Sequence, residues 1–192
     1  MYFLTKELYF PSVETASPEG IVAVGGDLSP ERLVLAYNSG IFPWFEDDEP
    51  ILWWSPSERM VLFFEDLKIS KSMRNIINQK KFKVTFNTAF REVILNCKKI
   101  ARKDQPGTWI TDDMVEAYCN LHKLGIAKSV EVWENEELVG GLYGIDLGHV
   151  FCGESMFSKV SNASKMAFIA LAKQLEMANY RLLDCQVYND HL

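Results

Sequence analysis

Three side chains that suit proton transfer or amine binding lie at the ends of apolar segments. Glu154 follows a glycine after one apolar run, and Asp184 and Gln186 alternate with Cys185 in another. If the second run is a strand, the spacing of two places Asp184 and Gln186 on one face. A carboxylate beside an amide could then hold a nitrogen donor by hydrogen bonds. The alternative, which is favoured for an isolated pair of this kind, is that both side chains only satisfy neighbouring backbone groups.

Other catalytic arrangements have little support in the sequence. Ser155 and Ser158 have no histidine at a suggestive distance along the chain, which argues against a Ser-His-Asp triad. The four cysteines form no C-x-x-C pair and no ligand spacing with the three histidines, so we expect reduced, mostly buried thiols. Neither a P-loop nor a dinucleotide fingerprint occurs. We therefore expect no metal and no cofactor.

The elements that must position these groups follow from the hydrophobic period of the C-terminal half. Residues 128–156 alternate as three antiparallel strands, with turns near Asn135-Glu136 and near residues 146–148. A helix is expected from about 162 to 178, and residues 181–188 are expected to form one more strand. The order helix, meander, helix, strand predicts an α+β fold with a mostly antiparallel central sheet flanked by helices, compatible with an acetyltransferase-like domain.

The N-terminal half has fewer clear elements. Its first sixty residues are rich in turn formers, and only one helix is predicted there, capped by Ser29 and ended by Gly40. Further along, we expect a helix from Ser70, a strand over residues 81–87, a helix over about 88–102, and a helix capped by Thr111 and stopped by Gly125. We predict a small N-terminal domain over residues 1–62 and a catalytic domain over residues 63–192.

Composition is that of a globular protein. The chain has 192 residues, 48% of them hydrophobic, which is enough for one domain with a small appendage. No apolar run approaches the roughly 20 residues of a membrane span, and the N-terminus has neither a basic flank nor an apolar signal core. We expect a cytoplasmic protein with no membrane partner, and a monomer.

The charge is unevenly distributed. Residues 71–103 carry ten Lys or Arg against one acid, a charge of +9, which leaves −15 for the rest of a chain of net charge −6. A basic segment in an acidic protein is a candidate site for a polyanion such as tRNA, because phosphate neutralisation releases counterions. The alternative is that these side chains are the solvated faces of helices and a strand. The candidate tRNA-binding residues are Lys71, Arg74, Lys80, Lys81, Lys83, Lys98, Lys99, Arg102 and Lys103.

Seven sequence blocks occur together in one order over about residues 10 to 192. They are VGGDLSPERLVLAYNSGIFPWF, ILWWSP, GTWITDDMVEAYCNLH, SVEVWENEELVGGLYG, FCGESMFS, NASK and LLDCQVYNDH. In sequence and order they resemble the leucyl/phenylalanyl-tRNA–protein transferase family. The resemblance implies a small N-terminal domain followed by an acetyltransferase-like domain. It also implies transfer of leucine or phenylalanine, and less readily methionine, from aminoacyl-tRNA to the α-amino group of a protein beginning with Arg or Lys, which creates an N-degron for proteolysis.

The resemblance also assigns the aromatic side chains of the ILWWSP and GTWI blocks. It implies that Trp53 and Trp109 hold the 3′-terminal adenosine of the tRNA, because a base stacks favourably on indole. For Trp44 we favour core packing, and for Trp54 both interpretations stay open. The acidic residues 46–49 are expected to form a solvated loop.

The remaining site residues are also implied by the resemblance. Leu142, Met156 and Phe168 match the apolar acyl pocket. The catalytic pair corresponds to Asp184 and Gln186, with Gln186 orienting the amine, Asp184 polarising that interaction and Glu154 nearby. Whether the pair relays a proton or only positions the amine is left open, and a ribose 2′-hydroxyl is a further candidate for assistance.

Two other functions remain as alternatives. One is a non-catalytic protein of the same fold that binds aminoacyl-tRNA. The other is a small-molecule acetyltransferase, which is disfavoured because residues 157–165 lack the Gly-rich turn that cradles coenzyme A. The family normally continues beyond the NDH motif, so we expect a missing C-terminal segment after Leu192.

Overall fold

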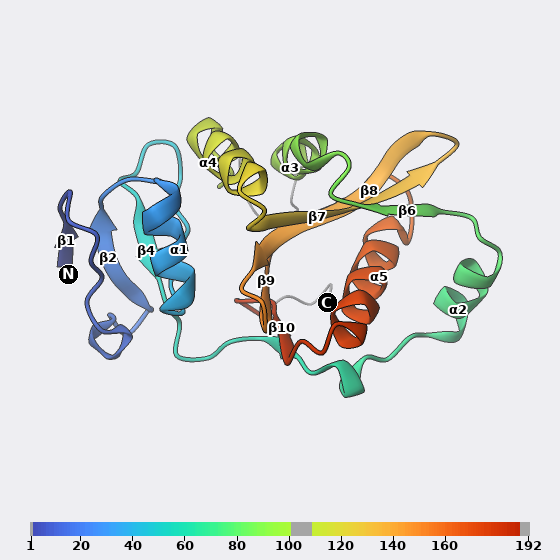
Figure 1. The fold of residues 1–192 in the computed structure, drawn as a ribbon, viewed down its shortest axis with the longest axis horizontal. Helices are drawn as coiled ribbons and strands as arrows, with labels where there is room; N and C mark the ends of the chain where they lie inside the picture. Colours follow the sequence, from blue (N-terminus) through green and yellow to red (C-terminus); the bar gives the residue numbers. More distant parts are fainter. Residues whose placement is uncertain (1, 101–108, 189–192) are drawn as a thin grey trace.

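The computed structural model describes residues 2–100 and 109–188, which form two sheets and the helices around them (Figure 1). The smaller sheet has four strands in the order β1-β2-β4-β3. Its β1–β2 pair is parallel, and its other pairs are antiparallel. The strands are β1 (Tyr2–Leu4), β2 (Ile21–Gly25), β3 (Phe42–Pro43) and β4 (Leu52–Trp54).

The larger sheet has six strands in the order β5-β10-β9-β8-β7-β6. Strands β7, β8 and β9 form the predicted antiparallel meander, and β10 is parallel to β9. The strands are β5 (Val61–Leu62), β6 (Lys83–Phe86), β7 (Ala127–Glu134), β8 (Glu137–Asp146), β9 (Val150–Ser158) and β10 (Leu182–Asp184). The sheet is therefore mixed but mostly antiparallel.

Five α-helices lie within the described ranges, and most begin where the sequence predicts. The side chains of Ser29, Ser70 and Thr111 each accept a backbone hydrogen bond at a helix start. The third helix begins slightly later than predicted and has no cap from its own segment; Glu131 of β7 accepts from the backbone at its start instead. The helices are α1 (Pro30–Asn38), α2 (Lys71–Asn78), α3 (Phe90–Lys99), α4 (Asp112–Lys123) and α5 (Ala163–Met177).

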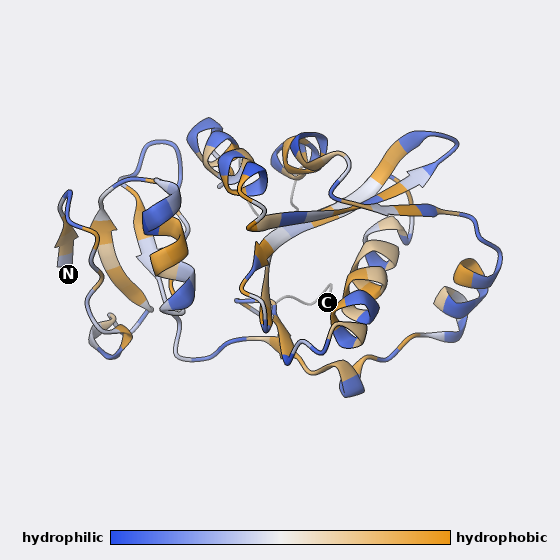
Figure 2. Ribbon diagram, viewed as in Figure 1, coloured by the Kyte–Doolittle hydropathy of each residue, from blue (hydrophilic) through white to orange (hydrophobic). Residues whose placement is uncertain are grey.

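Two hydrophobic clusters fill the two faces of the larger sheet. Helices α3 and α4 cover one face, and α5 covers the other (Figure 1). The apolar residues of α5 and of the strands beneath it give the centre of the molecule its hydrophobic colouring in Figure 2. The α3–α4 cluster continues into the N-terminal region, where it includes Tyr37 of α1 and Phe42 and Trp53 of the smaller sheet. The two sheets therefore share one buried core.

Two elements differ from expectation. Residues 1–60 contain a four-stranded sheet where the sequence predicts only one helix, because its strands are too short to show a clear period. Strand β10 covers residues 182–184 and not 181–188, because Gln186 has a positive φ of 62° that ends the extended conformation. Strand β5, on the N-terminal side of the expected domain boundary, pairs with β10 in the larger sheet.

The contact between α5 and β8 generates a stability prediction. A Cβ at Gly140 would lie 2.6 Å from Cβ of Ala163, at the start of α5, and 2.9 Å from the Ala163 carbonyl carbon. We expect Gly140→Ala to lower the free energy of unfolding by about 1–3 kcal/mol through overpacking, measured by urea denaturation. Gly153→Ala is the matched control, because its Cβ would meet the Asp184 carbonyl oxygen at an ordinary 3.6 Å. Equal stability of the Gly140 and Gly153 variants would contradict the prediction.

Candidate functional site

A β-bulge in β9 positions Glu154. Tyr143 of β8 pairs with Ser155, and the next β8 residue, Gly144, pairs with Gly153, so Glu154 has no partner in the ladder. A bulge of this kind turns the extra side chain away from its regular direction. The bulge also explains why Phe151 and Met156, five residues apart, both pack on the α5 side. Glu154 consequently lies at an interruption of the sheet.

The Glu154 carboxylate receives hydrogen bonds from two other parts of the chain. Gln186, just after β10, donates from Nε2 to Oε1 at 2.7 Å, and Tyr118 of α4 donates from its hydroxyl to Oε2 at 3.3 Å. The Tyr118 hydroxyl also bonds to the hydroxyl of Tyr37 on α1. Sheet, helix and N-terminal region therefore meet at a single carboxylate.

Burial raises the pKa of Glu154 to about 7. Hydrogen bonds from Tyr37, Gln186 and Tyr118 act in the opposite direction, and the negative charge of Asp184 raises the pKa further. Burial also raises the pKa values of Tyr37 and Tyr118 well above their ordinary value, so both remain neutral donors. A carboxyl group with a pKa near neutrality is suited to accept a proton.

Asp184 bonds to a neighbouring backbone group, as the favoured alternative predicts, and also to Arg59, which the sequence does not predict. Its Oδ1 accepts from the backbone N–H of Gln186 at 2.8 Å, and its Oδ2 accepts from Nε and Nη2 of Arg59 at 3.1 and 2.5 Å. The prediction that Asp184 and Gln186 share a strand face is wrong, because the strand ends at Asp184 and Gln186 turns into the left-handed region. Asp184 holds the Gln186 backbone, and the Gln186 side chain pairs with Glu154.

In this arrangement the amide oxygen of Gln186 can accept a hydrogen bond from a nitrogen donor. Because Nε2 of Gln186 is engaged by Glu154, the amide oxygen is the acceptor that remains for an incoming N–H. The nearby thiols are not suited to nucleophilic attack, since burial raises the pKa of Cys152 and raises that of Cys185 to about 12. The chemistry that fits these groups is direct attack by an amine, with an adjacent carboxylate to take its proton.

The expected acyl-pocket residues lie together on the α5 side of the sheet. Leu142 of β8 pairs in register with Met156 of β9, and Phe168 comes from α5. Leu142 is buried in the α5 cluster, while Met156 and Phe168 are half-buried against it. The sequence therefore selects three residues that the fold brings into one apolar cluster, two residues along β9 from Glu154.

The tryptophans differ in their accessible surface. Trp53 is fully buried, packs edge-on against Phe10 at 4.9 Å, and donates from its indole N–H to the Gly25 carbonyl at 2.8 Å. The expectation that Trp53 stacks on adenosine is not compatible with this position, because neither ring face is accessible. Trp109, just before α4, is half-buried and packs on the same core cluster.

Trp44 and Trp54 also retain partial exposure. They form a tilted ring pair at 5.6 Å, in which the Trp54 indole N–H donates to the Trp44 carbonyl at 2.7 Å. Both pack against the core that contains Trp53. The adjoining acidic residues 46–49 are exposed, as expected for a solvated loop. Exposed aromatic surface in this block therefore belongs to Trp44 and Trp54.

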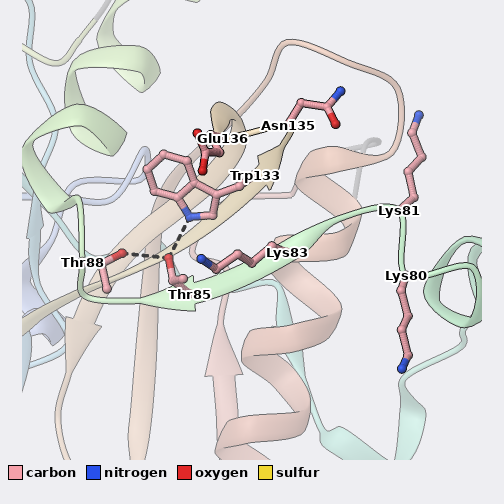
Figure 3. A pocket seen from close by; sticks show the side chains of 8 residues that line it. All are labelled: Lys80, Lys81, Lys83, Thr85, Thr88, Trp133, Asn135 and Glu136. Atoms are coloured by element: carbon pink, nitrogen blue, oxygen red, sulfur yellow. Dashed lines mark hydrogen bonds between the residues drawn. The ribbon is translucent and has the colours of Figure 1, made fainter.

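Several basic residues surround an open hollow at the edge strand β6. Lys80, Lys81 and Lys83 line it together with Trp133, whose indole N–H donates to the Thr85 hydroxyl at 2.8 Å (Figure 3). The hollow has a volume of about 580 Å³, and Thr88, Asn135 and Glu136 complete its lining. Lys83 lies beside Thr85, the side chains of Lys80 and Lys81 point in opposite directions, and Lys81 forms an ion pair with Glu134 at 3.4 Å (Figure 3).

The other basic candidates are more dispersed. Lys71 and Arg74 are exposed on α2, and Lys99 is exposed at the end of α3. Lys98 forms an ion pair with Asp112 at 2.7 Å, so the carboxylate of Asp112 partly neutralises its charge. Arg102 and Lys103 lie outside the described residues. Lys71 and Arg74 lie in the element that precedes the hollow at β6.

Three residues of this site were not selected as functional from the sequence. They are Tyr118, Tyr37 and Arg59. A tyrosine on a buried face is itself a weak signal, because its hydroxyl needs a partner. The partners come from remote segments, with Tyr37 and Tyr118 separated by 81 positions. Spacing along the chain cannot reveal such a pair.

The cysteines and the other potential metal ligands are dispersed. In the described ranges, no group of three or more His, Cys, Asp or Glu side chains is arranged to hold a metal ion. Within the same part of the chain, no helix is both long and apolar enough to span a membrane. Three of the four cysteines are buried and one is half-buried, and none of them forms a disulfide, as expected.

Comparison with known proteins gives a consistent result. Residues 61–192 match the family described as leucyl/phenylalanyl-tRNA protein transferase, and residues 26–57 match the N-terminal domain of that family. Proteins named leucyl/phenylalanyl-tRNA–protein transferase from Flavobacterium johnsoniae and Flavobacterium psychrophilum are 71% and 65% identical over the whole chain, which covers 91% of each. A protein of the same name from Christiangramia forsetii is 56% identical, and the chain covers 92% of it. The chain belongs to the leucyl/phenylalanyl-tRNA–protein transferase family.

Proposed function

We propose that the chain transfers leucine or phenylalanine, and less readily methionine, from aminoacyl-tRNA to the α-amino group of proteins that begin with Arg or Lys. Aminoacyl transfer from tRNA to a protein N-terminus is the activity of the family to which the chain belongs. The acyl and acceptor preferences are the finer part of the proposal. The product would carry a new N-terminal residue that acts as an N-degron for proteolysis.

The observation that carries this proposal is the pairing of Gln186 with Glu154. Nε2 of Gln186 donates to Glu154, which leaves the amide oxygen to accept from the α-amine of the acceptor protein. Glu154, with a pKa raised to about 7, then takes a proton from the amine as it attacks. Asp184 holds the backbone of Gln186 and thereby its orientation.

The proposed reaction needs little activation. The amine nitrogen attacks the ester carbonyl carbon, a C–N bond forms, and the C–O bond to the tRNA ribose breaks. The proton lost by the nitrogen passes through Glu154 to the departing ribose oxygen, so the carboxylate is regenerated. Because the aminoacyl ester is already reactive, alignment of the two reactants supplies much of the rate.

We further assign the binding surfaces. Leu142, Met156 and Phe168 would hold the acyl side chain, because they form one apolar cluster and Met156 lies two residues along β9 from Glu154. The half-buried indole of Trp109, with the partly exposed Trp44 and Trp54, would hold the terminal adenosine by stacking. The basic surface of α2 and β6 would contact phosphates of the acceptor stem.

The broader organisation fits the same activity. A central antiparallel meander followed by a helix and a strand parallel to β9 supports an acetyltransferase-like catalytic domain over residues 63–192, preceded by a small domain over residues 1–62 whose last strand, β5, pairs with the larger sheet. Because aminoacyl-tRNA is the proposed donor, we place the protein in the cytoplasm, acting as a monomer without a cofactor.

One assay separates this function from its alternatives. Leucyl-tRNA carrying labelled leucine is incubated with the protein and an Arg-initiated peptide, and the label is followed. Label on the peptide supports transfer. Label retained with the protein, without transfer, would indicate a protein that only binds aminoacyl-tRNA. An absence of binding, with acetyl transfer from acetyl coenzyme A, would indicate a small-molecule acetyltransferase.

The pKa of Glu154 generates a pH prediction. Both Glu154 and the peptide amine, whose ordinary pKa is about 7.7–8.0, must be deprotonated for attack. We expect log kcat/KM for the peptide to rise with a slope of about 2 below pH 7 and about 1 just above it. Glu154→Gln lowers the rate and leaves a single slope of about 1. Glu137→Gln, an exposed change on β8, is the control. A wild-type profile in Glu154→Gln would exclude this role.

A second prediction concerns Trp109. Trp109→Ala should raise KM for leucyl-tRNA roughly 5- to 150-fold, the equivalent of the about 1–3 kcal/mol that one stacked base contributes. Trp109→Phe should recover part of the loss, because it restores an aromatic face. Trp109→Leu is the control for packing: it retains apolar contact with the core but offers no ring. Equal KM values for the Phe and Leu variants would indicate that Trp109 is only structural.

A third prediction concerns the basic surface. Replacing Lys71, Arg74, Lys80 and Lys83 with Ala should weaken tRNA binding and reduce the steepness of its salt dependence by roughly 0.7–0.9 for each phosphate that the variant no longer neutralises. Binding is measured by fluorescence anisotropy between 50 and about 200 mM salt. Replacing four other exposed lysines, Lys123, Lys159, Lys165 and Lys173, with Ala is the control for net charge. The same salt slope in wild type and the fourfold variant would rule out phosphate binding on this surface.

A further inference from the structure

Arg59 occupies a constrained position between the two sheets. Its Nε and Nη2 donate to Oδ2 of Asp184 at 3.1 and 2.5 Å, and its Nη1 donates to the Gly40 carbonyl oxygen at 3.1 Å. The guanidinium also lies over the ring of Phe42, 5.1 Å from its centroid. Its side chain is 22% exposed, so solvent competes only partly for these donors. One side chain therefore engages the smaller sheet and the end of β10 together.

The backbone around Arg59 reinforces this connection. Met60 donates from its N–H to the Gln186 carbonyl at 3.0 Å and accepts at its own carbonyl from the Cys185 N–H at 2.8 Å. The next residue, Val61, pairs in register with Asp184. Segment 59–61 therefore lies along the turn that carries Gln186 and is in contact with it at several points.

The turn after β10 depends on Asp184. Gln186 has a φ of 62°, which an L residue adopts only when its surroundings hold it there. The bond from the Gln186 N–H to Asp184 Oδ1 supplies part of that hold. Asp184 in turn has both oxygens within reach of Arg59, at 3.3 Å from Nε to Oδ1 and at shorter distances to Oδ2. Orientation of Gln186 thus follows from Arg59 through Asp184.

We propose that Arg59 is a positioning residue for the transfer reaction, which fixes Asp184 and thereby the turn that aims the Gln186 amide at the acceptor amine. The inference rests on the proposed function, in which Gln186 binds that amine. Arg59 does not itself touch the reactants. It makes the geometry of the reaction depend on the N-terminal region, because Gly40 and Phe42 hold the far side of its guanidinium.

Arg59 also influences the charge around Glu154. The groups that face Glu154 are the hydroxyls of Tyr37 and Tyr118, the Gln186 amide, the Cys152 thiol and the Asp184 carboxylate. Arg59 balances the negative charge of Asp184. Without Arg59, the uncompensated carboxylate would make ionisation of Glu154 harder and raise its pKa. A residue that only stabilised the fold would leave that pKa unchanged.

The test uses Arg59→Met and Arg59→Lys in single-turnover transfer from leucyl-tRNA to an Arg-initiated peptide. For Arg59→Met we expect kcat to fall roughly 10- to 100-fold, as for a small misplacement of reacting groups. KM for the peptide should stay within about twofold. The rise of the rate with pH that reports deprotonation of Glu154 should move to higher pH. Lysine keeps the charge but cannot form the planar fork. Arg59→Lys should therefore lower kcat several-fold but leave the pH dependence that reports deprotonation of Glu154 unchanged.

Two controls make the result decisive. Arg181→Met removes an exposed arginine just before β10 and should behave as wild type. Arg59→Met in an Asp184→Asn background should cost little more than Asp184→Asn alone, because the two residues act in series. If Arg59→Met does not fold, Arg59→Lys decides by itself. Wild-type kcat in a folded Arg59 variant would overturn the inference.

The inference and the proposed function fail in different ways. If wild-type protein transfers no label, the proposed function fails. If wild type transfers label but Gln186→Ala does so at the same rate, the role of Gln186 fails. If Gln186→Ala is slow and both Arg59 variants are as fast as wild type, only the positioning role of Arg59 fails.

Discussion

The site depends on the interruption of β9 at Glu154. With no partner in the ladder, Glu154 turns from the regular strand direction and meets groups from outside the sheet. A carboxylate removed from water is costly unless hydrogen bonds satisfy it. Gln186 and Tyr118 provide these bonds. They offset only part of the cost of burying the charge, so the pKa of Glu154 is raised. The bulge therefore sets both the position and the acidity of the group.

The N-terminal region contributes groups to this site. Tyr37 reaches Tyr118 from α1, and the carbonyl of Gly40 holds one nitrogen of Arg59. The core cluster that contains Tyr118 continues through Phe42 into the smaller sheet, so the two sheets are joined by apolar packing as well as by these polar contacts. The N-terminal region is therefore in contact with the end of β10 through Arg59 and with Glu154 through the two tyrosines.

The chemical groups match a reaction that needs alignment more than activation. Burial suppresses ionisation of the thiols beside the site, and the tyrosines next to Glu154 are held neutral. Gln186 presents an oxygen in a fixed direction because its amide nitrogen is engaged. For an ester that is already activated, such preorganisation is the main contribution a protein can make. Leu142 and Met156 belong to one apolar cluster on the α5 side of the sheet, and Met156 lies two residues along β9 from Glu154.

The sequence by itself determined the helix starts at Ser29, Ser70 and Thr111 and the meander, and it selected Glu154, Asp184 and Gln186 as candidates, because caps, alternation and residue type are local properties. Only the tertiary structure decided how those residues are connected. It buried Trp53, ended β10 at Asp184, and supplied Tyr37 and Arg59 from distant segments. Burial and hydrogen-bond partners depend on which residues of the whole chain pack around a side chain. The residues next to it in the sequence do not determine them.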